Sequence, residues 1–414
     1  MTHDLTQSRD RLPGGFLEQS LFASELGMNS QVIEDEKLQG NTITLRGETL
    51  YNFGLCSYLG LSDDPRLVES AIDAIRRYGN SYSSSAAYTS IPLYNDLKDR
   101  LSQMVGASVL VAGTTTLAHH AALPVLIGSG DLVLIDELAH SSLLSVLPTL
   151  KTRRATIERV KHNDLDRVAS RASAADGRVW YLIDGVYSMH GDLAPARDIA
   201  TLLDTHDSLW VYSDDAHGFG WSGLRGRGPF LDSSGWHPHL VMSYGLSKSF
   251  AASGGVVAAK DPNLIRAIEL TGGPMVFGGP VPPASLGAGI ASADIHLSDE
   301  LPVLQADLSE RIDFVNDYAA QIGLPLTARE HTPLWFVQIG SSNTSVSVGA
   351  RVMRDGYYVN VAVYPVVKKG RSGIRFTVTR YNSMSEIRGF LGSLNAARLS
   401  YEPDDDILDL TLFE

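Results

Sequence analysis

Polar side chains follow two strand-like segments in the middle of the chain. Residues 209–213 run directly into the sequence D-D-A-H-G, which supplies Asp214 and His217, and residues 240–243 lead into Lys248. Ligands of parallel sheets bind at the carboxyl ends of the strands. A lysine at such a place can form a Schiff base when burial or neighbouring charges lower its pKa. Taken alone, Lys248 is equally well a solvated ion-pair partner, but the two segments together predict a reactive site.

An acid and a lysine on neighbouring strand ends suit pyridoxal phosphate (PLP). A carboxylate such as Asp214 keeps the pyridine nitrogen protonated, so that the ring accepts electrons from a carbanion at the substrate Cα. Lys248 would hold the aldehyde carbon of the cofactor and later shuttle the Cα proton. We therefore expect PLP as the cofactor and no metal site.

Three more segments offer groups for the same cofactor, and each has an ordinary structural alternative. Ser188 follows a strand-like run and is a hydroxyl donor to the ring or a turn serine. Thr114, Thr115 and Thr116 join a strand to a helix, where N–H groups and hydroxyls bind phosphate or simply cap the helix. His140 opens a helix, where its imidazole stacks on the ring or caps that helix.

The elements that position these residues alternate between strands and helices. We expect strands at 108–111, 132–135, 179–183, 209–213, 240–243 and 255–259, and helices at 64–77, 93–105, 115–127 and from about 140. Strands separated by helices are typical of a mostly parallel, helix-covered α/β sheet. This large domain is predicted to span residues 51–285.

The two ends of the chain differ from this pattern. Residues 1–50 are predicted to form an N-terminal arm, with a helix near 15–26 and a hairpin in 31–50. Residues 286–414 are predicted to form a smaller α+β domain. Its elements are a long helix at 284–322 interrupted near Pro302, strands at 334–339, 358–361 and 373–378, and helices at 346–355 and 384–397.

Composition narrows the partners and the compartment. The net charge of −13 over 414 residues repels phosphate backbones and anionic lipids, so we expect neither a nucleic-acid nor a membrane partner. Cys56 is the single cysteine, which excludes an internal disulfide and favours a reducing compartment. Residues 1–10 lack the apolar core of a signal peptide, and no apolar run is long enough to cross a membrane. A cytoplasmic protein is predicted.

Read together, the motifs resemble those of the α-oxoamine synthases. These are fold-type I PLP enzymes that include 8-amino-7-oxononanoate synthase, glycine C-acetyltransferase, serine palmitoyltransferase and 5-aminolevulinate synthase. The matching segments are Y-L-G-L at 58–61, D-x-x-x-H-S-S at 136–142, G-V-Y-S-M-x-G-D at 185–192, D-D-A-H-G at 214–218, Ser247-Lys248 with S-G-G at 253–255, and G-I-R-F at 373–376.

The resemblance implies a fold and a role for each matched residue. The fold would be a large domain with a mostly parallel seven-stranded sheet and a smaller C-terminal α+β domain, in a homodimer with active sites at the interface. The implied roles are Asp214 at the pyridine nitrogen, His217 and Ser188 at the ring oxygen, His140 stacked on the ring, Ser247 and Lys248 in the Schiff-base segment, and Arg375 at the substrate carboxylate.

The chain departs from the family pattern around the phosphate and the substrate. Gly245 stands where the family commonly has a threonine that binds phosphate, and residues 278–280 lack the hydroxyls that a neighbouring subunit usually supplies. Thr114, Thr115 and Thr116 replace the usual phosphate loop. Cys56 takes the place of an asparagine near the substrate carboxylate, and Ser85 that of an arginine.

The function implied is a decarboxylative condensation of an α-amino acid with an acyl thioester, giving an α-aminoketone. Acyl-CoA or an acyl carrier protein would be the acyl donor, and His140 or His217 would stabilise the developing oxyanion. Two alternatives remain. One is an aminotransferase or amino-acid decarboxylase with the same cofactor, and the other is a binding protein of the same fold without turnover.

Overall fold

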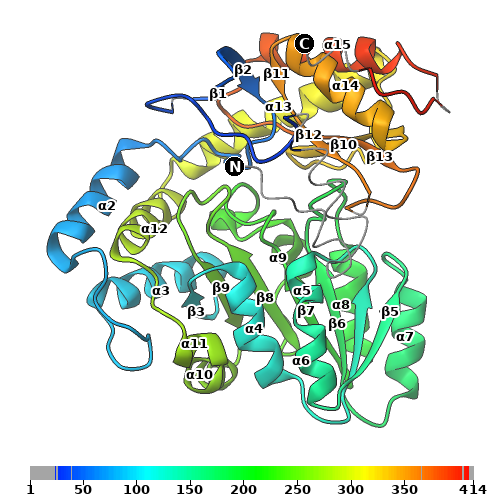
Figure 1. The fold of residues 1–414 in the computed structure, drawn as a ribbon. Coiled ribbons are helices and arrows are strands. Elements are labelled where there is room, and N and C mark those ends of the chain that lie inside the picture. Colours follow the sequence, from blue (N-terminus) through cyan, green and yellow to red (C-terminus); the bar gives the residue numbers. More distant parts are fainter. Residues whose placement is uncertain (1–23, 25–26, 39, 365, 403–404, 410–414) are drawn as a thin grey trace, which may run out of the picture. The chain divides into compact units, whose positions relative to one another are not determined.

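The computed structural model describes residue 24 and residues 27–38, 40–364, 366–402 and 405–409. Of the helix expected near 15–26, all residues but Ser24 lie outside the described residues. Contacts group the chain into two compact units, one of Cys56–Ser309 and one of Met1–Leu55 with Glu310–Glu414. Each is described by itself (Figure 1). The division into domains at residues 50 and 285 stays a prediction. Over the described residues, every helix is too short or too polar to cross a membrane.

The unit Cys56–Ser309 is built on a seven-stranded sheet. Its strands are β3 (Ser108–Ala112), β4 (Leu132–Asp136), β5 (Thr156–Val160), β6 (Val179–Asp184), β7 (Leu209–Asp214), β8 (Leu240–Gly245) and β9 (Gly255–Ala259), in the order β3-β9-β8-β7-β6-β4-β5. β9 runs antiparallel to both of its neighbours, and the remaining pairs are parallel. The mostly parallel sheet predicted from the sequence is confirmed.

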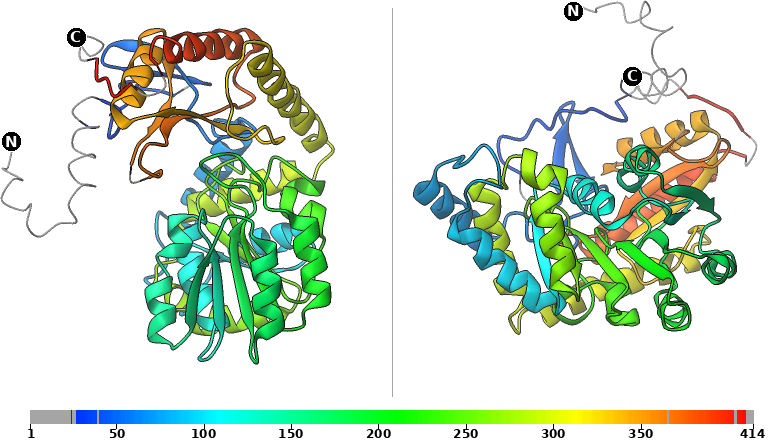
Figure 2. Two further views of the ribbon diagram at one scale, coloured as in Figure 1. Left: turned by 90° about the vertical axis from the view of Figure 1, so that its right-hand side faces the viewer. Right: turned by 90° about the horizontal axis from the view of Figure 1, so that it is seen from below.

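Helices cover both faces of this sheet (Figure 2) because the strands are apolar on both sides. In β6, for example, Tyr181 packs into the core on one face and Trp180 into the core on the other. One face holds α4 (Thr115–Leu126), α5 (Ser141–Leu144), α6 (Leu147–Thr152) and α10 (Pro262–Thr271). The other holds α2 (Pro65–Tyr78), α3 (Pro92–Val105), α7 (Leu165–Ala174), α8 (Ala196–Thr205), α9 (Pro229–Ser234) and α12 (Pro283–His296). A short helix, α11 (Gly273–Phe277), follows α10.

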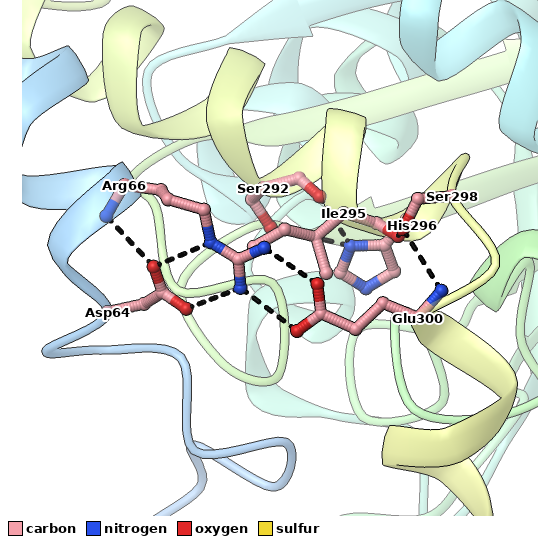
Figure 3. Close-up of polar contacts among 7 residues, drawn as sticks. All are labelled: Asp64, Arg66, Ser292, Ile295, His296, Ser298 and Glu300. Atoms are coloured by element: carbon pink, nitrogen blue, oxygen red, sulfur yellow. Dashed lines mark hydrogen bonds and ion pairs between the residues drawn. The ribbon is translucent and has the colours of Figure 1, made fainter.

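The long helix expected at 284–322 is two helices, because the chain breaks after His296. α12 ends there and α13 (Leu301–Gln321) begins after four residues. The connection is held by polar contacts (Figure 3): the Ser298 hydroxyl donates to the Ile295 carbonyl, and the guanidinium of Arg66 donates to both carboxylate oxygens of Glu300. Arg66 also pairs with Asp64, the N-cap of α2. The predicted interruption is therefore real and falls a few residues before Pro302.

The other unit contains two small sheets. The hairpin of β1 (Thr42–Leu45) and β2 (Glu48–Asn52) adds β11 (Tyr357–Tyr358), and β10 (Leu334–Gly340), β13 (Ser372–Thr377) and β12 (Asn360–Ala362) form an antiparallel sheet. α14 (Ser342–Arg354) and α15 (Met384–Arg398) belong to the same unit, and Ser383 and Glu386 form a capping box at the start of α15. The predicted smaller α+β domain is confirmed, and the N-terminal hairpin groups with it.

Candidate active site

A cavity of about 200 Å³ lies at the carboxyl ends of β6, β7 and β8. The strand register places Asp184 beside Asp214, and Asp214 beside Ser243, so the residues that follow these strands meet at one edge. The residues lining the cavity are Thr114, Thr115, Thr116, His140, Ser142, Asp184, Val186, Asp214, Ala216, His217, Ser247 and Lys248. The cavity thus brings together eight of the residues predicted from the sequence.

Asp214 is a buried carboxylate held on two sides. Its side chain is 5% exposed, Oδ2 accepts a hydrogen bond from His119 Nε2 at 2.9 Å, and Oδ1 accepts one from the Ala216 N–H at 3.1 Å. Burial alone would raise its pKa, but the charge and hydrogen bond of His119, together with Lys248 and His140, hold the pKa below its ordinary value. Asp214 therefore stays ionised at the wall of the cavity.

His119 was not predicted from the sequence. It lies on α4, its side chain is fully buried, and its Nδ1 is 2.9 Å from the hydroxyl of Tyr212. Tyr212 precedes Asp214 by two residues in β7, so both side chains point to the sheet face that α4 covers. A histidine among the alanines of this apolar helix was the available signal, since a buried imidazole needs polar partners.

Lys248 and Ser247 follow β8 and line the cavity. Lys248 is half-buried, and its charge is one of those that lower the pKa of Asp214. Lys248 and Asp214, from the ends of neighbouring strands, therefore line the same cavity.

His140 precedes α5 and lines the cavity as a neutral imidazole. Burial lowers its pKa below the ordinary value, and the charges of Lys248 and His119 lower it further against the opposing effect of Asp214. Its Nδ1 accepts a hydrogen bond from the Ser142 N–H at 3.2 Å, so the proton of the neutral ring sits on Nε2. His140 can thus donate a proton in a hydrogen bond without carrying a charge.

His217 lies in the loop after β7 and is oriented by an aromatic neighbour. Its Nδ1 is 2.8 Å from the hydroxyl of Tyr58, which is fully buried, and its carbonyl accepts from Trp221 Nε1 at 2.7 Å. Tyr58 comes from the Y-L-G-L segment, so this segment positions the imidazole. Tyr58 is a second residue of the site that sequence reasoning did not identify as such.

The N-terminus of α4 forms the end of the cavity that suits an anion. Thr114 is the N-cap, with its hydroxyl accepting from the Leu117 N–H at 3.1 Å, and the helix begins at Thr115. The first N–H groups of an α-helix have no acceptor within the helix and carry a partial positive charge. Together with the hydroxyls of Thr115 and Thr116 they offer donors for a phosphate.

Two glycines, Gly255 and Gly245, leave room for Thr115 at the wall of the cavity. A Cβ at Gly255 would lie 2.5 Å from both the N and Cα of Thr115, so the bare backbone of β9 lets α4 start against it. A Cβ at Gly245 would lie 3.1 Å from Thr115 Oγ1. A threonine hydroxyl is therefore present beside position 245 although that residue is glycine.

Three predicted residues are not among those lining the cavity. Ser188 is half-buried in the turn after β6, and the same segment contributes Val186 instead. Cys56 is half-buried at the start of the unit Cys56–Ser309. Arg375 lies on β13 in the other unit. Their roles stay predictions.

Asp215 is a second buried carboxyl next to Asp214, surrounded by glycines. A Cβ at Gly185, Gly218 or Gly228 would overlap its carboxyl group. Burial, together with the charge of Asp214, raises the pKa of Asp215 to about 8. Asp215 is therefore neutral near pH 7, and the negative charge at this strand end belongs to Asp214.

Asp192, which ends the segment 185–192, belongs to a charged cluster outside the cavity. His162 Nε2 donates to Asp192 at 2.6 Å, and its Nδ1 lies 3.1 Å from Asp136 at the end of β4. Burial alone would lower the pKa of His162, but the two carboxylates raise it to about 9. The cluster ties the segment after β6 to the end of β4, and so shapes the loop next to the cavity.

Comparisons of sequence agree on one group of relatives. A family model described as aminotransferase class I and II matches residues 48–388. The 8-amino-7-oxononanoate synthase of Maricaulis maris is 32% identical over 360 residues, which cover 86% of this chain and 88% of that protein. The enzyme of the same description from Symbiobacterium thermophilum is 30% identical, over 82% and 86% of the two chains.

Solved structures show the same fold at lower identity. A serine palmitoyltransferase from S. paucimobilis, solved with a bound PLP–myriocin aldimine, superposes with a TM-score of 0.86 at 21% identity, over 96% of this chain and 99% of that one. An 8-amino-7-oxononanoate synthase from Francisella tularensis superposes with a TM-score of 0.70 at 20% identity, over 84% and 97%.

Proposed function

The chain belongs to the α-oxoamine synthase family within the aminotransferases of class I and II, and we propose that it condenses an α-amino acid with an acyl thioester. The carbon–carbon bond forms at the Cα of the amino acid, the thiol leaves, and carbon dioxide is lost to give an α-aminoketone. The observation that carries the proposal is that Lys248, ionised Asp214 and neutral His140 line one cavity, with the first turn of α4 in the same wall.

The residues of the cavity fit PLP group by group. Lys248 would hold the aldehyde carbon of the cofactor, and Asp214, ionised and held at both oxygens, would face the pyridine nitrogen. The first turn of α4 with the hydroxyls of Thr115 and Thr116 would receive the phosphate. His140 would lie against the ring face, and His217 would bind the ring oxygen with Ser188. When bound, the cofactor supplies a ring that accepts the electron pair left when a bond at the substrate Cα breaks.

The protein's own groups then move protons and stabilise charge. Lys248 Nζ would take the proton from the substrate Cα, since Lys248 is the lysine that lines the cavity. The Nε2–H of His140 is a neutral donor for the oxyanion that develops when the thioester carbonyl is attacked. His217, fixed through Nδ1 by Tyr58, presents its Nε2 to the same space.

The substrates and the assembly complete the proposal. Arg375, with its planar fork of N–H donors, would bind the carboxylate of the amino acid, and Cys56 would lie near it. The acyl donor is acyl-CoA or an acyl carrier protein. A homodimer with active sites at the subunit interface and a cytoplasmic location follow from the family pattern and from the single cysteine.

A visible spectrum of the purified protein tests the cofactor. We expect a yellow protein after incubation with PLP, and loss of the visible absorption band in Lys248→Ala, which cannot hold the cofactor covalently. Lys260→Ala is the control, because Lys260 is exposed and donates to the Gly106 carbonyl. A protein that stays colourless with added PLP would contradict the proposal.

A second assay separates condensation from the other reactions of this cofactor. Amino acids are titrated into the holoenzyme, and those that change the spectrum are mixed with acyl-CoA or acyl carrier protein thioesters. Release of free thiol together with carbon dioxide supports condensation. Formation of a keto acid without thiol supports an aminotransferase instead, and carbon dioxide without thiol a decarboxylase.

A further inference from the structure

Three buried side chains form a hydrogen-bonded row behind the cavity. The hydroxyl of Tyr212 is 2.9 Å from His119 Nδ1, and His119 Nε2 is 2.9 Å from Asp214 Oδ2. Tyr212 and His119 are 0% exposed and Asp214 is 4% exposed. Only Asp214 of the three lines the cavity, so the other two act through it.

The proton positions in this row follow from chemistry. An ionised carboxylate only accepts hydrogen bonds, so His119 Nε2 must carry a proton toward Asp214. His119 Nδ1 faces the Tyr212 hydroxyl, which donates to a neutral ring and accepts from a protonated one. In either state the tyrosine hydroxyl fixes the orientation of the ring.

His119 is the neighbour whose side chain contacts Asp214 directly. The other ionisable groups around this carboxylate are Lys248 and His140 on the cavity side, with the buried carboxyls of Asp184 and Asp215. Burial and the charge of Asp214 raise the pKa of both of these carboxyls. Among the described residues, the side chain that hydrogen-bonds Asp214 is that of His119.

We propose that His119 is a positioning residue that keeps the Asp214 carboxylate ionised and directed into the cavity, with Tyr212 holding the imidazole. The inference deepens the proposed function and rests on it in one respect, namely that the group facing Asp214 is the pyridine nitrogen of PLP. A carboxylate without its partner would protonate or turn, and the cofactor would then lose its ionic contact.

The chain offers a matched control in the next residue. His120 lies on the same helix, but its Nε2 is 3.0 Å from the Ser145 hydroxyl, away from Asp214. The variants are therefore His119→Leu, which removes the donor, His119→Gln, whose Nε2 amide can replace it, and His120→Gln. Tyr212→Phe removes only the hydroxyl that holds the ring and serves if His119→Leu fails to fold.

Two measurements test whether His119 and Tyr212 act on Asp214, and the first of them needs no cofactor. Carbon-13 NMR of aspartate side chains follows the protonation of Asp214 in the PLP-free protein. The signal of Asp214 is identified by its absence in the Asp214→Asn variant. We expect ionised Asp214 at neutral pH in the wild type, His120→Gln and His119→Gln, and protonation at a higher pH in His119→Leu. The second measurement is the dissociation constant of PLP from the visible spectrum at equilibrium.

The expected losses follow from removing one partner of a buried charged hydrogen bond. PLP should bind on the order of 10- to 100-fold more weakly to His119→Leu, and about 3- to 10-fold more weakly to Tyr212→Phe. His119→Gln should lie within about threefold of the wild type, and His120→Gln should match it.

The outcomes separate the two proposals. If His119→Leu binds PLP like the wild type and Asp214 titrates unchanged, the positioning role is wrong. If His119→Leu does not fold, the positioning role is wrong when Tyr212→Phe binds PLP like the wild type and Asp214 titrates unchanged in it. If the wild type does not bind PLP, the proposed function fails, and the NMR titration of the cofactor-free protein still decides whether His119 holds Asp214 ionised.

Discussion

Gly255→Ala tests whether the start of α4 depends on the bare backbone of β9. The new Cβ would lie 2.5 Å from the N and Cα of Thr115 and 2.6 Å from the carbonyl carbon of Thr114, all of them backbone atoms. Ordinary van der Waals contact begins at 3.4 Å. The first turn of α4 must therefore move outward by roughly 1 Å, since no rotation of a side chain can relieve the overlap.

The magnitude follows from the close packing of the interior. Overpacking of a core costs about 1–3 kcal/mol, and the backbone conformation of Gly255, which does not have a positive φ, adds no penalty of its own. The same outward movement displaces the donors proposed for the phosphate of PLP. We expect cofactor binding to weaken on the order of tenfold or more, because a charged hydrogen bond contributes about 1.5–3 kcal/mol.

Urea unfolding of the cofactor-free protein and equilibrium titration with PLP measure the two effects separately. Gly273→Ala is the control, because a Cβ at Gly273 in the same unit meets nothing within 4 Å. We expect Gly273→Ala to match the wild type in both assays. If Gly255→Ala unfolds at the same urea concentration as the wild type and binds PLP equally well, the proposed packing of α4 against β9 is refuted.

Three further predictions concern single side chains. Thr115→Val should weaken PLP on the order of tenfold in the same titration while changing the unfolding free energy by less than about 1 kcal/mol, and equal binding would remove this hydroxyl from the phosphate site. His162, whose pKa is raised to about 9 by Asp136 and Asp192, contributes stability that is complete below its unfolded pKa near 6.5 and is lost as the pH rises through 9. His162→Gln should therefore remove about 2–3 kcal/mol at pH 6 and flatten the pH dependence of urea unfolding between pH 6.5 and 9, and parallel curves would contradict the cluster. Asp215, with its pKa raised to about 8, likewise contributes stability that is complete below pH 3.8 and is lost as the pH rises through 8, so Asp215→Asn should flatten unfolding curves across that window, and an unchanged slope would show that Asp215 is ionised in the folded protein.

The buried strands could be predicted from the sequence because their apolar runs are continuous. β9 has the predicted bounds, and β6, β7 and β8 extend the predicted strands by one or two residues. β5 was not predicted, since it is an edge strand with Glu158 and Arg159 in the run, and charged side chains are common on such edges. The helices α7, α8 and α10 were also not predicted, although their buried residues recur at helical spacing, as Ile199 and Leu203 do in α8.

The site could be predicted where a reactive residue lies at the end of a strand or within three residues after it. Lys248 and Asp214 stand at such positions, and a strand end is visible in the sequence. His119 and Tyr58 are different, because the partners that give them a role are 95 and 159 residues away along the chain. Only the fold shows which distant group completes a hydrogen bond, so a supporting residue of this kind carries little local signal.

The glycines around Asp215 have a consequence for how this sequence can change over time. Gly185, Gly218 and Gly228 come from separate segments, yet each leaves out a Cβ that would overlap the same carboxyl group. A larger residue at any of the three therefore becomes acceptable only after Asp215 has been shortened. At Gly185 the three nearest atoms all belong to Asp215, whereas a Cβ at Gly218 would also overlap Pro229 and Gly228 has a positive φ. In related chains positions 185 and 215 should therefore covary, with a non-glycine residue at 185 found alongside a small residue at 215.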